Sequence, residues 1–134
     1  MMRFGALLLA SGWVLTAVAH AQGYTPVRPV KTLSGWQCMS IASVYGADGT
    51  NAPPVPVYDG PGPGAPRVGT GAGVIIVPSP LQPVNGRVEM LWPNGRKVWI
   101  QADELAPWHS LSNPNAVCHP TLLSNGRYGF TTSG

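Results

Sequence analysis

RVEMLWPNGRKVWIQADEL, residues 87–105, is the stretch that decides the fold, because two apolar runs there flank an Asn-Gly pair. Asn-Gly between apolar runs is the strongest short signal for a β-hairpin. If Asn94 and Gly95 are the two turn residues, both have positive φ and Trp92 lies opposite Lys97. Both faces of the ribbon are then partly apolar. A two-stranded ribbon is not stable alone in water, so the rest of the chain must cover it.

Short strands are expected on both sides of this hairpin. The 15 prolines and 17 glycines are spread through the chain, which excludes long helices and favours strands joined by turns. The sequence predicts an extended lead-in at 22–33, a strand or a short helical turn at 34–45 and a loop at 47–54. Between these and the hairpin we expect an edge strand at 55–58, a loop at 59–70 and a strand at 73–77. From residue 102 onward we expect a helical turn at 102–105, a strand at 106–108 and a terminal hairpin between 122–123 and 128–130.

The first 21 residues have the pattern of an export signal. Arg3 is followed by an apolar stretch, and Ala19-His20-Ala21 is a small-x-small cleavage site. The stretch is short for a membrane span, which needs about 20 apolar residues. We therefore expect a periplasmic or secreted protein that has no membrane segment after cleavage.

The charge of the remaining chain is low and mixed. Seven basic residues stand against five acidic ones after residue 21, and no basic run is longer than Arg96-Lys97. A nucleic-acid-binding surface needs a larger basic cluster, so we expect no nucleic acid among the partners.

A family resemblance covers about half of the mature chain. The segment from Val55 to Trp108 resembles the bacterial SH3 domain in the order of its parts. These parts are VY at 57–58, GPGPG at 60–64, VG at 68–69 with VIIV at 74–77, VEMLW at 88–92, NG at 94–95, WI at 99–100 and DEL at 103–105. The resemblance implies a small five-stranded barrel that binds cell-wall peptides. Arg87 stands where the family tends to have tryptophan, and Val98 stands where it has glycine.

These parts divide the chain into four segments. They are a signal peptide at 1–21, an N-terminal extension at 22–51, an SH3-like barrel at 52–108 and a C-terminal extension at 109–134. The fold class expected is therefore all-β, a five-stranded SH3-like barrel whose two extensions are joined by a disulfide. The candidate binding residues around the barrel are Tyr58, Arg87, Trp92, Arg96 and Trp99.

Cys38 and Cys118 are the only cysteines, and they flank the barrel segment in an exported chain. A disulfide between them is the expected state. One alternative is a thiol nucleophile served by His109 or His119, which would need a scaffold of its own. Another is a zinc site made of the same four residues, although the paired spacing of such sites is absent.

Other chemistry finds little support in the sequence. Asp103 and Glu104 are adjacent in a helical turn and cannot face each other as a glycosidase pair does. The glycines at 69–73 lack the spacing and the lysine of a phosphate loop. We expect no enzyme, no cofactor and no metal.

Asn-Gly-Arg occurs three times, ending at Arg87, Arg96 and Arg127. The simpler interpretation is three turns with solvated arginines. The functional interpretation is that arginines at turn tips hold carboxylates of peptidoglycan stems.

The function expected is that of an exported, non-catalytic binding module for cell-wall peptide or glycan, with peptidoglycan as the partner. The alternative is a structural or assembly subunit that binds another envelope protein. A small Cys/His hydrolase is the third hypothesis. The oligomeric state is left open by the sequence.

Overall fold

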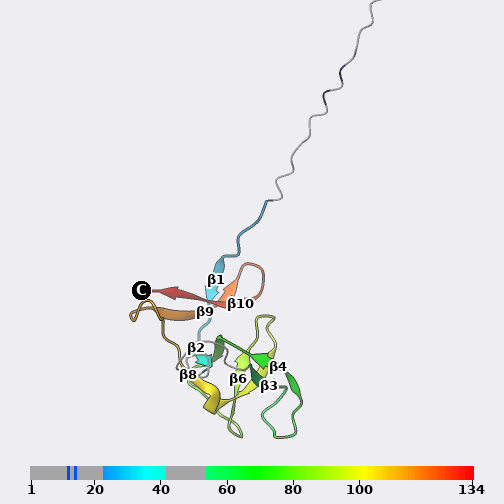
Figure 1. The fold of residues 1–134 in the computed structure, drawn as a ribbon, viewed down its shortest axis with the longest axis vertical. Helices are drawn as coiled ribbons and strands as arrows, with labels where there is room; N and C mark the ends of the chain where they lie inside the picture. Colours follow the sequence, from blue (N-terminus) through cyan, green and yellow to red (C-terminus); the bar gives the residue numbers. More distant parts are fainter. Residues whose placement is uncertain (1–11, 13, 15–22, 42–53) are drawn as a thin grey trace, which may run out of the picture.

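Two antiparallel β-sheets make up the protein in its computed structural model, which describes residues 12, 14, 23–41 and 54–134 (Figure 1). The larger sheet has seven strands in the order β4-β3-β7-β6-β5-β2-β8. Their bounds are β2 Trp36–Ile41, β3 Val55–Tyr58, β4 Arg67–Gly71, β5 Val74–Pro78, β6 Arg87–Leu91, β7 Lys97–Gln101 and β8 Leu105–Pro107. One 3₁₀ turn, η2 Ala102–Glu104, precedes β8. The all-β class is therefore confirmed. The proposed signal peptide at 1–21, apart from residues 12 and 14, and the expected loop at 47–54, apart from residue 54, lie outside the described residues.

One face of the larger sheet forms the hydrophobic core. Alternate residues of five strands meet there, as expected for sheets with one buried face. They are Met39 and Ile41 of β2, Val55 and Val57 of β3, Ile75 and Val77 of β5, Val88 and Met90 of β6, and Val98 and Ile100 of β7.

The larger sheet curls around this core. A Cβ placed on Gly71 of the edge strand β4 would lie 3.3 Å from Ile41 Cδ1 of β2 and 3.4 Å from Ile100 Cδ1 of β7. β4 and β2 are far apart in the strand order, so the sheet must bend strongly to bring them together. The edge strands β4 and β8 are nevertheless not paired with each other, so the sheet is not closed into a barrel and the five-stranded barrel is not confirmed.

The hairpin at 87–105 forms, but its predicted register is wrong by one residue. Lys97 pairs with Leu91 rather than with Trp92, and the Trp92 N–H donates to the Arg96 carbonyl at 2.9 Å. The loop has three residues instead of two. Pro93 is the physical reason, because its fixed φ suits the first central position of an ordinary turn, and Gly95 at φ 87° then provides the left-handed residue.

The two-residue Asn-Gly turn occurs earlier in the chain, between Val84 and Arg87. Asn85 has φ 51° and Gly86 has φ 75°, and the two flanking residues exchange both backbone hydrogen bonds. This is the type I′ geometry that was expected at 94–95. The third pair, Asn125-Gly126, closes a three-residue loop of the same kind as the one at 94–95.

Several other elements differ from the prediction in detail. β3 is not an edge strand, because it lies between β4 and β7. Pro56 is tolerated there because β7 pairs only with Val57 and Tyr58, beyond the proline. The expected loop at 59–70 contains most of β4, and the residues at 36–41 form a strand. The strand at 73–77 and the helical turn after β7 are confirmed as β5 and η2.

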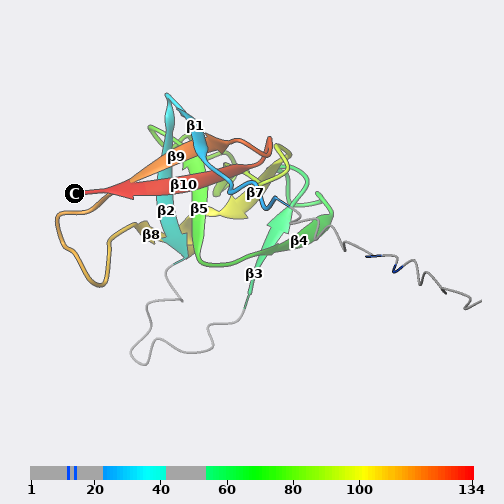
Figure 2. The same cartoon turned by 90° about the horizontal axis from the view of Figure 1, so that it is seen from above.

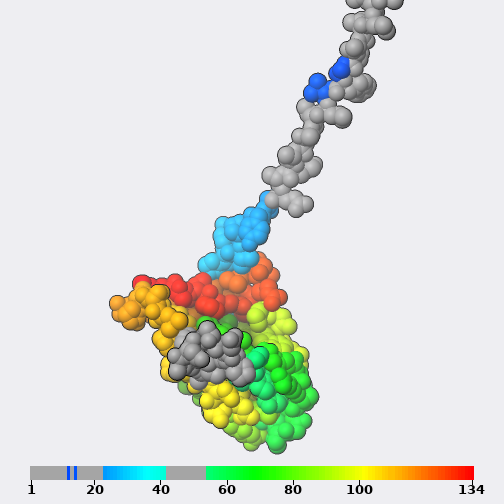
Figure 3. Space-filling model, in the orientation of Figure 1, coloured from blue at the N-terminus to red at the C-terminus, as the bar shows by residue number. Residues whose placement is uncertain are grey.

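The smaller sheet joins the two ends of the described chain. β9 Val117–Leu123 lies between β1 Pro29–Thr32 and β10 Tyr128–Ser133. The predicted terminal hairpin is confirmed as β9 and β10, and the lead-in contributes β1. The small sheet lies across one end of the larger one, as Figures 2 and 3 show.

The predicted disulfide is confirmed and links the two sheets. Cys38 of β2 and Cys118 of β9 are bonded, with their Cα atoms 6.0 Å apart. β2 was assigned to the N-terminal extension, yet it pairs with β5 and β8 inside the larger sheet. The bond therefore attaches the small sheet to the body of the large one.

Replacing the disulfide should lower stability strongly. In the chain-entropy model, a bond between residues 80 apart is worth about 4–5 kcal/mol as an upper figure. We expect the Cys38→Ser, Cys118→Ser double variant to melt well below the wild type in a calorimetric scan. The wild type should show no thiol that reacts with a labelling reagent before reduction, and two reactive thiols would contradict the bond.

Valine at position 95 should also destabilise the fold. The left-handed backbone costs a side chain about 1–2 kcal/mol, and a Cβ there would lie 3.2 Å from Tyr128 Cε2. We expect Gly95→Val to lower the free energy of unfolding by about 2 kcal/mol in urea titration. Gly62→Val is the control, because no heavy atom lies within 4 Å of its Cβ position. A larger loss from Gly62→Val would contradict the assigned turn.

Candidate functional site

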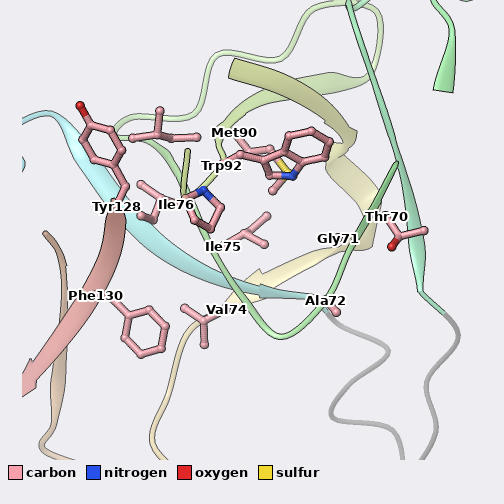
Figure 4. A pocket seen from close by; sticks show the side chains of 12 residues that line it. Thr70, Gly71, Ala72, Val74, Ile75, Ile76, Met90, Trp92, Tyr128 and Phe130 are labelled. Carbon is pink, nitrogen blue, oxygen red and sulfur yellow. The ribbon is translucent and has the colours of Figure 1, made fainter. Parts of the chain in front are cut away.

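An apolar pocket lies where the small sheet meets the open end of the large one (Figure 4). Its volume is about 240 Å³. The lining comes from β4, β5 and β6, from the hairpin tip and from β10, and consists of Thr70, Gly71, Ala72, Val74, Ile75, Ile76, Met90, Leu91, Trp92, Pro93, Tyr128 and Phe130. Three aromatic rings, one from the hairpin tip and two from β10, therefore share one cavity.

The strand pairing explains why this cavity exists. β5 pairs with β6 only through Ile76 and Leu91, so the two strands separate on either side of that pair. Small residues at 71–73 turn the chain between β4 and β5 and leave the space unfilled. Trp92 covers one side of the cavity. Its ring packs closely against Gly69 of β4, where an added Cβ would lie only 3.1 Å from the ring. Tyr128 and Phe130, two apart on β10, close the opposite side (Figure 4).

The five predicted binding residues fall into two groups. Tyr58, Arg87 and Trp99 share the face of the larger sheet that is turned away from the core. Trp99 pairs with Tyr58 in β3, and the Arg87 guanidinium lies 3.6 Å from the centre of the Tyr58 ring. Trp92 and Arg96 form the second group at the hairpin end, and only Trp92 lines the pocket.

Arg87 is held inside the protein rather than in solvent. It is only 6% exposed, and its Nη1 donates to the carbonyl oxygens of Gly60 at 3.1 Å and Gly62 at 2.7 Å. These bonds tie the glycine- and proline-rich loop at 59–66 to β6. Arg87 therefore positions this loop, and the expectation of a solvated turn arginine was wrong at this position.

Arg96 lies at the surface near the pocket. Its guanidinium carbon is 5.6 Å from the centre of the Trp92 ring, and its Nη2 is 2.8 Å from Asp59 Oδ1. Both partners of this ion pair are about half exposed, so the pair contributes little to stability. Arg96 is thus available to a ligand in a way that Arg87 is not.

The net positive charge of the described residues is concentrated on the small sheet and its flanks. Residues 36–41 and 54–108 carry four basic and four acidic side chains, so their charges cancel. Residues 23–35 and 109–134 carry three basic side chains and no acidic ones, namely Arg28, Lys31 and Arg127. An anionic ligand would therefore be attracted to the small sheet rather than to the larger one.

The cysteines and histidines provide no free thiol and no metal-binding group in the described part of the chain. Both sulfur atoms are bonded in the disulfide, so the thiol nucleophile considered above is absent. His119 Nε2 lies 2.8 Å from Ser133 Oγ across the β9–β10 pair. Among the residues that the structure describes, no three His, Cys, Asp or Glu side chains gather in a way that could hold a metal ion.

Trp92 is the only lining residue of the pocket that the sequence predicted as a binding residue, and the other two aromatic residues, Tyr128 and Phe130, were missed. Their spacing of two on a predicted hairpin places them on one face, which was a usable signal. What the sequence did not indicate was the surface against which that face packs. The Tyr128 N–H donates to the Pro93 carbonyl at 2.8 Å, which fixes β10 against the hairpin tip.

Comparisons of the chain with protein-family models, with curated proteins and with solved structures find no match. Over the described residues, the structure contains no helix that is long and apolar enough to cross a membrane. Fold and site together define an all-β protein with two disulfide-linked sheets and an aromatic pocket between them.

Removing the Arg87 side chain should destabilise the protein. Arg87→Ala leaves the Gly60 and Gly62 carbonyls without their charged donor, so we expect a loss of about 2–3 kcal/mol in the free energy of unfolding. Arg127→Ala is the matched control, since this arginine also follows Asn-Gly but is exposed, and it should cost less than about 0.5 kcal/mol. Chemical denaturation of both variants measures the difference, and equal stabilities would contradict the structural role of Arg87.

Proposed function

We propose that this protein is an exported, non-catalytic binding module for cell-wall peptide or glycan, related in its middle segment to bacterial SH3 domains. The observation that carries the proposal is the pocket lined by Trp92, Tyr128 and Phe130. Aromatic rings stack on the C–H faces of sugar rings, and apolar pockets accept the methyl groups of alanine and of N-acetyl substituents.

The size of the pocket limits what it can hold. Sites for small molecules usually measure roughly 300–1,000 Å³, and this pocket is smaller at about 240 Å³. It fits one sugar ring or a short peptide stretch rather than a whole cofactor. Such a site suits a repeating polymer, since each unit can present the same group.

The charges support an anionic ligand. Arg96 contacts Trp92 at the pocket, and Arg28, Lys31 and Arg127 give the neighbouring sheet its positive charge. Carboxylates of peptide stems would interact with these groups, and the attraction would weaken as salt is added. Trp92 and Arg96 are thus the predicted site residues best placed for this function.

The order of the elements supports the relation to bacterial SH3 domains. β3, a glycine- and proline-rich loop, β4, β5, the β6–β7 hairpin, η2 and β8 follow one another as the resemblance requires. The curled sheet around one core fits an SH3-like barrel that lacks hydrogen-bonded closure. β2 pairs with β5 and β8, so we place the start of this unit at Trp36.

A second function, a subunit that binds another envelope protein, is favoured by exposed apolar side chains around the small sheet. Val30, Val117 and Phe130 are each about half exposed or more. Apolar residues that gather on a surface often mark protein contacts. A pull-down from envelope extract beside one on peptidoglycan separates the two functions.

Shortening Phe130 should weaken binding without unfolding the protein. Phe130 lines the pocket and is 44% exposed, so Phe130→Ala removes a ligand contact at small cost to the core. We expect this variant to be retained severalfold less than the wild type on purified peptidoglycan. Leu111→Ala is the control, because Leu111 is exposed and lies outside the pocket, and it should bind normally. No retention of the wild type, or equal retention of all three proteins, would exclude the proposed function.

A further inference from the structure

β10 is an edge strand of the small sheet. It pairs with β9 on one side, and the strand order β1-β9-β10 places no strand on its other side (Figure 2). Phe130, Thr132 and Ser133 are exposed. The outer edge of β10 is therefore accessible from solvent from Phe130 onward.

The backbone groups that face this edge follow from the pairing with β9. The Leu123 N–H donates to the Arg127 carbonyl, so Arg127 forms a hydrogen-bonded pair. Such pairs alternate along antiparallel strands, and Gly129, Thr131 and Ser133 therefore also point their backbone groups toward β9. Those of Tyr128, Phe130 and Thr132 point outward. The Tyr128 N–H donates to the Pro93 carbonyl, whereas the N–H and C=O groups of Phe130 and Thr132 have no hydrogen-bond partner among the residues that the structure describes.

The other edge strands of the two sheets carry features that discourage pairing. Proteins protect such edges with short strands, charged residues or prolines. β1 has Pro29 and Lys31, β4 has Arg67, and β8 has only three residues and ends in Pro107. β10 has six residues, YGFTTS, without a charge or a proline. It is thus the edge that is open to another strand.

We propose that β10 pairs antiparallel with β10 of a second copy of this chain. A two-fold axis at Thr131 places Phe130 opposite Thr132 of the second copy and Thr132 opposite its Phe130. This register pairs the N–H and C=O groups of both Phe130 and Thr132, because every contact of a two-fold interface occurs twice. The strand carries no charge that would repel its own copy.

This interface is independent of the ligand proposed above. It joins the two small sheets into one continuous six-stranded sheet. Pairing involves the backbone edge of β10, whereas the side chains of Tyr128 and Phe130 line the pocket.

The register can be tested by charges at the axis. Thr131 faces its own copy, so like charges there lie directly opposite each other and destabilise the pair. We expect the mature wild type to sediment with twice the mass of one chain, and Thr131→Lys and Thr131→Glu each to sediment as single chains. An equimolar mixture of the two variants should regain the double mass. Thr131→Gln, a neutral side chain of similar length, should behave as the wild type.

Wild type that sediments as a single chain up to millimolar concentration would overturn the proposal. So would Lys and Glu variants that keep the double mass alone, because the axis would then lie elsewhere. The melting transition of each variant shows whether it is folded. Thr132→Pro gives a second probe. It removes an N–H group that points outward, leaves the hydrogen bonds to β9 intact and should also yield single chains.

Discussion

The bond between Cys38 and Cys118 is the constraint on which the rest of the structure depends. No strand of one sheet pairs with a strand of the other, and the small sheet has only three strands, of which β1 is exposed throughout. Three strands with so little buried surface are not stable alone in water. The disulfide holds β9 against β2, and β10 can then lie along the hairpin tip. The pocket between the sheets is therefore a consequence of a covalent link outside it.

The sequence predicted the class of fold and most of its elements, because the signals were local. β-branched runs, prolines and glycines define strands and turns without reference to distant residues. The register at 87–105 was not predicted, since Pro93 altered the turn and shifted every pair by one residue. The place of β2 could not be predicted either. A strand from the N-terminal segment pairs with β5 and β8 through contacts that only the folded chain provides.

The site was harder to predict than the fold, because it combines residues from strands that are far apart. Arg87 and Arg96 both follow Asn-Gly, yet one is buried over Tyr58 and the other is at the surface beside Trp92. The difference comes from their positions, since Arg87 lies across from the loop at 59–66 whereas Arg96 lies at the tip of a hairpin. Tyr128 and Phe130 line the pocket only because the Pro93 carbonyl accepts a hydrogen bond from the Tyr128 N–H, which holds β10 against the hairpin tip. Spacing along the chain does not contain this information.

The pairing of β1 with β9 also determines when the molecule can be completed. Arg28 and Ser124 are hydrogen-bonded although they are 96 positions apart in the sequence. Contacts of high sequence separation form late in folding, because they must close long loops. The small sheet cannot be completed until residues 117–133 have been synthesised. By then every strand of the larger sheet has already been made, so the larger sheet can form first.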